Sequence, residues 1–159
     1  MDSNLSPSAK RVQQAIQERG FQCDILELSS STRTAQEAAD AAGCELRQIV
    51  KSLVFATAHT GEPILALVSG ANRVDENLLA KAVGQPVVKA SGEFVHKHTG
   101  FAIGGVPPLG HALPLRTFID LDLMNLTVLW AAAGTPHAIF SVTPADLVEM
   151  TGGTVMKIA

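Results

Sequence analysis

Apolar and polar positions alternate along this chain with two periods, one typical of amphipathic helices and one typical of buried strands. Several segments combine an N-cap residue with apolar positions three or four apart, and most of them end at a glycine. These segments predict helices over residues 9–19, 35–42, 44–49, 76–83, 92–99 and 144–151. Their predicted N-caps are Ser8, Thr34, Asp75, Ser91 and Thr143.

The remaining apolar runs are short and predict strands. They cover residues 21–28, 51–57, 63–69, 86–90, 113–121, 126–133 and 136–142, and residues 153–159 can close the sheet. The turn HTGE at 59–62 makes 51–69 a hairpin. Because strands and helices do not alternate regularly, we expect an α/β fold of the α+β type, in which helices flank a mixed, largely antiparallel sheet of about seven strands.

Composition adds that this is one folded domain over residues 1–159. Of the 159 residues, 47% are hydrophobic and 17% are charged, which is typical of a globular protein that buries a core. The apolar run 126–134 is far shorter than a membrane span, and the first residues carry no apolar signal segment. Cys23 and Cys44 are too few for a disulfide framework. We therefore expect a cytoplasmic protein with reduced thiols and no membrane partner.

The charge balance limits the nucleic-acid partners. The net charge is −3 and the sequence pI is about 5.9, with lysines and arginines scattered along the chain. Proteins that coat nucleic acid need a basic stripe to neutralise many phosphates. We therefore expect no DNA partner and no general RNA coating. An enzyme that holds only one end of an RNA remains compatible with this charge.

Several common catalytic signatures do not occur. The sequence contains no G-x-S-x-G elbow, no H-E-x-x-H, no Walker A motif and no G-x-G-x-x-G after a strand. His96 and His98 are the closest pair of histidines, but residues two apart point to different sides of a helix. We therefore expect neither a metal nor another cofactor.

The polar candidates for a site are Lys51, the cluster Asn72, Arg73 and Asp75, and His137. Lys51 lies among buried-strand residues, where it is either a surface lysine of an edge strand or a charge aimed at a phosphate or carboxylate. The cluster directly follows a strand, and turn and capping chemistry explains Asp75 fully. His137 begins a strand, where a hydrogen-bonded core histidine is the common alternative.

The segment HTGFAIGGVPPLGH (98–111) is the most unusual stretch. Gly104 and Gly105 lie between Ile103 and Val106, inside what would otherwise be a strand, and two prolines stiffen the chain behind them. Paired glycines expose backbone N–H groups and allow a ligand to approach closely. A rigid row of amide donors in an apolar wall can stabilise an oxyanion. A glycine bulge at a sheet corner is the alternative interpretation.

These elements occur together, and in this order, in one known family. IVKSLVF, LVSGANRVDENLLAKAVG, HTGFAIGGVPPLGH and GTPHAIF resemble the YbaK family of editing domains, which is related to the insertion domain of bacterial prolyl-tRNA synthetases. The resemblance runs from about residue 9 to residue 153, and its most specific piece is the G-x-x-x-P element at 104–108. It implies trans-editing, the hydrolysis of the ester that joins a wrong amino acid to tRNA.

The resemblance also implies roles for individual residues, without a metal. Lys51 faces the acceptor end of the tRNA, and Gly104 and Gly105 form the loop against the aminoacyl ester. His137 occupies a position that helps to hold the aminoacyl group in the synthetase-linked domains. That position is not histidine in the original YbaK branch, so this chain is closer to the other branches. The remaining predicted substrate-binding residues are Asn72, Ile103, Val106, Pro108, Gly134 and Thr135.

The resulting hypothesis is a deacylase for a small to medium amino acid on proline tRNA or a related tRNA, with an aminoacyl-tRNA synthetase as a possible partner. The amides around Gly104 and Gly105 polarise the ester carbonyl, while Lys51 contacts phosphate or sugar oxygens. The pocket walls are predicted to be Val54, Ile103, Val106 and Ala133. The alternatives are a non-catalytic module that binds a tRNA end, a nucleotide or an amino acid, a structural protein, and a serine hydrolase using Ser69 or Ser91. The sequence assigns no role to His111.

Overall fold

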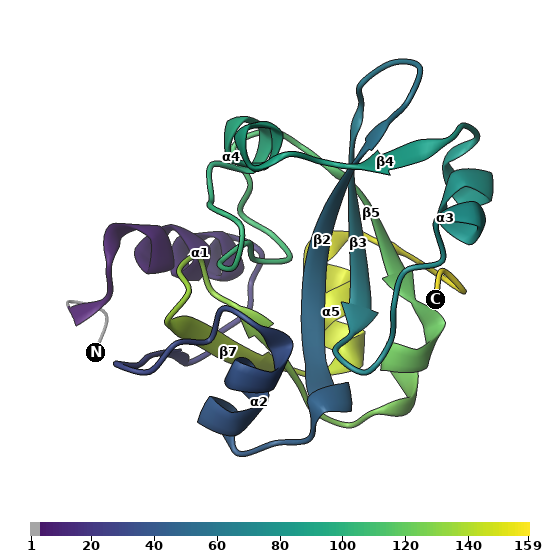
Figure 1. The fold of residues 1–159 in the computed structure, drawn as a ribbon. Helices are drawn as coiled ribbons and strands as arrows, with labels where there is room; N and C mark the ends of the chain where they lie inside the picture. Colours follow the sequence, from purple (N-terminus) through teal and green to yellow (C-terminus); the bar gives the residue numbers. More distant parts are fainter. Residues whose placement is uncertain (1–3) are drawn as a thin grey trace.

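The computed structural model describes residues 4–159, which form an eight-stranded mixed sheet with helices around it (Figure 1). Four strand pairs are antiparallel (β1/β7, β2/β3, β2/β4 and β6/β7) and three are parallel (β2/β6, β3/β5 and β5/β8). The strands are β1 (Ile25–Glu27), β2 (Ile49–Thr57), β3 (Pro63–Ser69), β4 (Val87–Lys89), β5 (Arg116–Asp120), β6 (Leu129–Ala132), β7 (Ala138–Val142) and β8 (Thr154–Met156). The predicted fold class is confirmed, with one strand more than the seven expected.

The order of strands in the sheet is β1-β7-β6-β2-β3-β5-β8, and β4 pairs with β2 outside this path. The helices are α1 (Pro7–Glu18), α2 (Ala35–Ala42), α3 (Glu76–Val83), α4 (Gly92–Thr99) and α5 (Pro144–Thr151), with short 3-10 turns at Leu46–Gln48 and Leu121–Asn125. In Figure 1, α5 lies behind the central strands and α2 lies to the left of the lower end of β2. None of the helices in residues 4–159 has both the length and the apolar character to cross a membrane.

The centre of the core is β3, which is buried on both faces. Leu65 and Leu67 pack into the cluster that α1 and α5 also enter, whereas Ile64, Ala66 and Val68 pack into the cluster around α3. All five side chains are fully buried. This explains the continuous apolar run in the sequence, because a strand covered on both faces has no polar alternation. A third, smaller cluster packs α2 against β2 and β7.

Most predicted helix ends are confirmed. The Thr34 side chain accepts from the Glu37 amide, and the Glu37 side chain accepts from the Thr34 amide, which completes the capping box. Gly43, Gly84 and Gly100 end their helices in the left-handed conformation. Left-handed backbone favours glycine, because its missing Cβ removes the steric penalty.

Several predicted elements begin or end elsewhere. The helix predicted over 44–49 is only a 3-10 turn at Leu46–Gln48, because Ile49 already pairs with β6 as part of β2. The first helix starts at Pro7, and its N-cap is Ser6 rather than Ser8; Pro7 fits the first turn because no amide is needed there. The strand predicted over 21–28 shrinks to β1, since only Ile25–Glu27 pair with β7.

Candidate active site

The candidate site lies at a stretch of β2 that has no neighbouring strand on one edge. β6 pairs with β2 at Ile49 and Val50, and β4 pairs with it at Phe55–Thr57, so residues 51–54 have no strand beside them on that edge. A cavity of about 470 Å³ lies there. Residues of β2, β4, β6, α2 and the loop that follows α4 line it.

Ser52 presents polar groups at this gap. The Val54 carbonyl accepts from the Ala90 amide beyond the end of β4, at 3.2 Å. Because backbone groups alternate between the two edges of a strand, the amide and carbonyl of Ser52 face the same edge, where no strand pairs with them. The Ser52 hydroxyl is also buried and has no hydrogen-bond partner within the described residues. Nothing in the sequence singled out Ser52.

Lys51 lines the cavity, and its ammonium group is held in place. Its Nζ donates to the backbone carbonyl of Asn72. Burial, and then the nearby charge of Arg73, lower the pKa of Lys51 below its ordinary value. The Asn72 side chain points elsewhere and donates to Asp122 at 2.8 Å. In this structure Asn72 therefore positions Lys51 through its backbone carbonyl, and its predicted contact with substrate stays a prediction.

The glycine-rich segment forms a turn and belongs to no strand of the sheet. The Gly105 amide donates to the Ala102 carbonyl at 3.1 Å, and a Cβ on Gly105 would lie 2.8 Å from the Thr135 backbone. Gly105 is therefore needed for close packing, and its amide is not the free donor that was predicted. Gly104 has a φ of +96°, lines the cavity and donates no hydrogen bond within residues 4–159, so its amide is available to a ligand.

Arg33 and Thr32 are site residues that the sequence analysis missed. A Cβ on Gly104 would lie 2.6 Å from Cγ of Arg33, so this arginine rests directly on the glycine turn. Thr32 is 4% exposed and lines the cavity, and its hydroxyl is buried without a partner in the described residues. Both residues precede the N-cap Thr34, and only that neighbourhood could have drawn attention to them.

The apolar wall is largely as predicted. Val54, Ile103 and Val106 line the cavity, together with Ala131 and Ala132. Ala133 does not line it, because its side chain is fully buried in the core behind β6.

The other predicted residues lie outside the cavity lining. His137 is exposed, and its Nδ1 is 3.1 Å from the Ser30 carbonyl, while its amide donates to Thr135 Oγ1. Gly134 packs against the Ser8 carbonyl, and Pro108 is buried beside a second, smaller hollow. The contacts predicted for Pro108, Gly134, Thr135 and His137 with substrate remain predictions.

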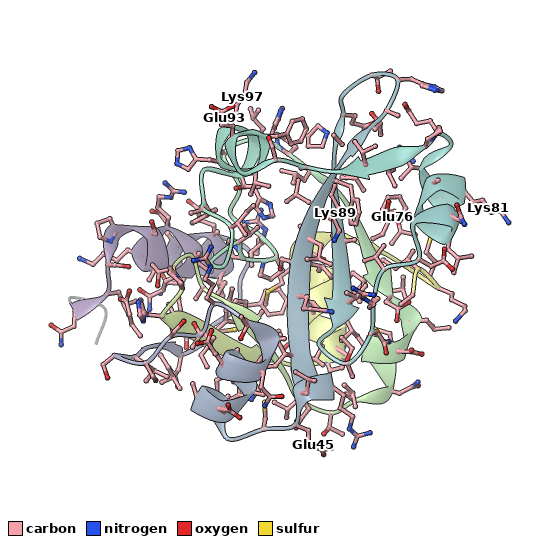
Figure 2. The ribbon with its side chains drawn as sticks, in the orientation of Figure 1. Glu45, Glu76, Lys81, Lys89, Glu93 and Lys97 are labelled. Atoms are coloured by element: carbon pink, nitrogen blue, oxygen red, sulfur yellow. The ribbon has the colours of Figure 1, made fainter. Side chains whose placement is uncertain are left out.

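Among the described residues, no histidine, cysteine, aspartate or glutamate lines the cavity. Elsewhere in residues 4–159, no three such side chains gather closely enough to hold a metal ion. The charged groups on the cavity are instead cationic: Arg33, Lys51 and Lys89. In Figure 2, Lys89 lies in front of β2 near β4, whereas Lys81 and Lys97 point away from the sheet.

Residues 29–150 match the model of the aminoacyl-tRNA editing domain. The chain belongs to this family. The match includes every residue that lines the cavity, from Thr32 to Ile139.

Individual relatives agree with this assignment. Over 128 residues the chain is 29% identical to YwhH of Bacillus subtilis, covering 80% of this chain and 81% of YwhH. It is 36% identical to a proline–tRNA ligase of Limosilactobacillus fermentum over 97 residues, which are 58% of this chain and 17% of the ligase. A crystal structure described as "a putative trans-editing enzyme for prolyl tRNA synthetase" superposes with a TM-score of 0.92, at 51% identity and 98% coverage of both chains.

Proposed function

We propose that this protein is a trans-editing deacylase. It hydrolyses the ester between tRNA and a wrong amino acid of small to medium size, on proline tRNA or a related tRNA. The observation that carries the proposal is the cavity at the open edge of β2, where Lys51, the free amide of Gly104 and an apolar wall meet. The relatives associated with prolyl-tRNA synthetase support the choice of tRNA.

The size of the cavity suits the end of a tRNA. A volume of about 470 Å³ lies in the range of small-molecule sites. It can take a terminal adenosine with a small aminoacyl group, whereas a base-paired stem must stay outside. The short apolar side chains of Val54, Val106 and Ala131 leave room for a small amino acid and exclude large aromatic ones. One methylene group is worth only about 1–3 kcal/mol in an apolar pocket, so the wall separates amino acids of similar size poorly. It excludes larger amino acids because their side chains do not fit.

The reaction needs an activated carbonyl and a water molecule. The Gly104 amide donates to the ester carbonyl oxygen and stabilises the oxyanion that forms when water attacks the carbonyl carbon. One such donor contributes about 3 kcal/mol to the transition state. The carbon–oxygen bond to the ribose then breaks, and the ribose oxygen takes up a proton. Because the described residues of the lining offer no carboxylate or imidazole, the neighbouring ribose hydroxyl is the group that assists the water.

Lys51 holds the acceptor end as a point charge on its phosphate or sugar oxygens. The carbonyl of Asn72 fixes where that charge lies. A metal ion has no part in this reaction, which takes place in the cytoplasm, where tRNA is charged. An aminoacyl-tRNA synthetase is the partner that supplies the substrate.

The test is deacylation of a panel of aminoacyl-tRNAs by the wild type, Lys51→Ala and Gly104→Val, with and without a chelator. We expect rapid hydrolysis of one or a few small aminoacyl species, lost at least tenfold in both variants and unchanged by the chelator. Lys81→Ala is the matched control, because Lys81 is an exposed lysine on α3 outside the cavity.

Other outcomes would contradict the proposal. If the wild type hydrolyses no species yet binds an aminoacyl-adenosine analogue, the protein is a binding module. If activity disappears with the chelator, a metal ion takes part in the reaction.

A further inference from the structure

The charged residues around the cavity are all of one sign. Arg33 before α2, Lys51 on β2 and Lys89 on β4 line it, and no aspartate or glutamate of residues 4–159 does. The whole chain has 15 acidic and 12 basic residues. In a protein with an acidic balance, three cations from three elements around one cavity create a local positive potential that attracts an anion.

Two of these cations have no partner in residues 4–159. The ion pairs there join Arg47 to Glu45 and Arg116 to Glu62, so neither Arg33 nor Lys89 is neutralised by an acid. Both side chains are exposed, and no hydrogen bond from either side chain to another described residue is seen. Lys51 differs, since the Asn72 carbonyl already holds its ammonium group.

The acidic residue of the adjoining helix turn does not compensate Arg33. Glu37 accepts hydrogen bonds from the Thr34 amide at 3.2 Å and from the hydroxyls of Thr34 and Ser31. Its carboxylate is thus used to cap α2. The Arg33 side chain meanwhile rests on Gly104, at the glycine turn and at the cavity.

We propose that Arg33 and Lys89 form a phosphate clamp for the RNA backbone next to the terminal adenosine. Lys51 lies deeper, while these two exposed cations meet the phosphates of the preceding nucleotides where the strand leaves the cavity. Arg33 has a planar guanidinium group that can bind one phosphate through two hydrogen bonds, and Lys89 adds a point charge. This inference rests on the proposed function and names the part of the substrate that the clamp holds.

The experiment compares two substrates that differ in phosphates. One is the aminoacyl-tRNA that the wild type hydrolyses fastest, and the other is the same amino acid esterified to adenosine, which has no phosphate. For Arg33→Gln and Lys89→Gln we expect the KM for aminoacyl-tRNA to rise about tenfold, the effect of losing one charge-assisted hydrogen bond. We expect kcat to stay unchanged, and hydrolysis of the aminoacyl-adenosine to equal that of the wild type.

Two further measurements distinguish a phosphate clamp from a purely structural role of the two residues. Each substitution should reduce the slope of log KM against log salt by about 0.7, the contribution of one phosphate contact on a single strand. Lys81→Gln and Lys97→Gln are the control substitutions, since both lysines are exposed and neither lines the cavity. They should change neither KM nor the slope. Thermal unfolding of all four variants checks that they fold.

The proposed clamp is wrong if Arg33→Gln reduces the hydrolysis of both substrates equally, because the arginine then acts only by supporting the Gly104 turn. It is also wrong if neither variant alters the KM for aminoacyl-tRNA. If the wild type hydrolyses neither substrate, the proposed function has failed instead. Binding of a single-stranded RNA that ends in CCA and carries no amino acid then tests the clamp separately. The two variants should bind this RNA at least fivefold more weakly than the wild type. Equal binding would overturn the clamp.

Discussion

At the scale of single residues, the site is marked by polar groups that the fold leaves unsatisfied. The hydroxyls of Thr32 and Ser52 are buried beside the cavity and have no partner in residues 4–159. Leaving such a group unpaired costs about 1–3 kcal/mol of folding free energy. A cavity that keeps two of them is arranged to exchange hydrogen bonds with a ligand.

Thr32→Val should therefore stabilise the free protein and weaken its activity. Valine keeps the shape of threonine and removes the unpaired hydroxyl, so we expect the free energy of unfolding to rise by about 1 kcal/mol. Deacylation should fall, because the ligand loses a partner. Denaturant unfolding and aminoacyl-tRNA hydrolysis measure the two effects.

Thr99→Val is the matched control. Thr99 is equally buried, but its hydroxyl donates to the Val95 carbonyl at 2.7 Å and accepts from the Phe101 amide at 3.0 Å. This substitution should lower the free energy of unfolding by about 1–3 kcal/mol. If Thr32→Val destabilises the protein to the same extent, the Thr32 hydroxyl has a partner in solution and our interpretation is wrong.

The sequence predicted some of these residues and not others, for a physical reason. Lys51 and Gly104 were conspicuous because a lysine in a buried strand and a glycine pair before two prolines break the local pattern. Thr32, Arg33 and Ser52 break no pattern. They become site residues only because α2, β2 and the glycine turn pack around one cavity. Sequence periodicity predicts single elements and does not predict which elements pack together.

At the scale of elements, the loop that carries Gly104 is held by His111. The ring Nε2 of this histidine lies 2.7 Å from the Pro107 carbonyl, and its ring meets Phe101 edge-on. Burial lowers the pKa of His111; the bond to Pro107 raises it and the charge of Arg19 lowers it. Neutral His111 therefore donates from Nε2 and fixes the loop behind the glycine turn.

This lowered pKa makes the stability of the protein depend on pH. The unfolded state binds a proton at His111 near its ordinary pKa of 6.5, before the folded state does, so acid favours unfolding. The free energy of unfolding should fall as the pH drops from 7 to 5, and fall less in His111→Gln. His59→Gln is the control, because His59 is exposed. Identical pH profiles for wild type and His111→Gln would contradict this role.

Elements defined by local signals were predicted well, and those defined by distant partners were not. The N-caps Thr34, Asp75, Ser91 and Thr143 are confirmed. Each can be recognised from the sequence because the cap and the amide that it binds lie within four residues of one another. The short extent of β1 and the gap between β4 and β6 depend on which strands reach β2 and β7. The gap at residues 51–54 opens the site, and no local pattern encodes it.

At the scale of the whole molecule, the charge distribution limits how much RNA the protein can hold. The net charge of −3, with 12 basic and 15 acidic residues, argues against a broad basic face for a tRNA stem. The cations Arg33, Lys51 and Lys89 meet at one cavity. The protein can thus bind the end of an RNA strand, while its remaining surface, acidic on balance, repels the body of the tRNA and other nucleic acids.

This distribution predicts a shallow dependence of binding on salt. Three phosphate contacts on a single strand, at about 0.7 each, give a slope of log K against log salt near −2. We expect that slope for a tRNA analogue with a non-hydrolysable aminoacyl group, measured from low to physiological salt. A short hairpin with the same acceptor end should give the same slope, because the added tRNA body meets no further cations. A slope steeper than about −4 for the full tRNA, but not for the hairpin, would reveal a second RNA-binding surface and contradict end-only recognition.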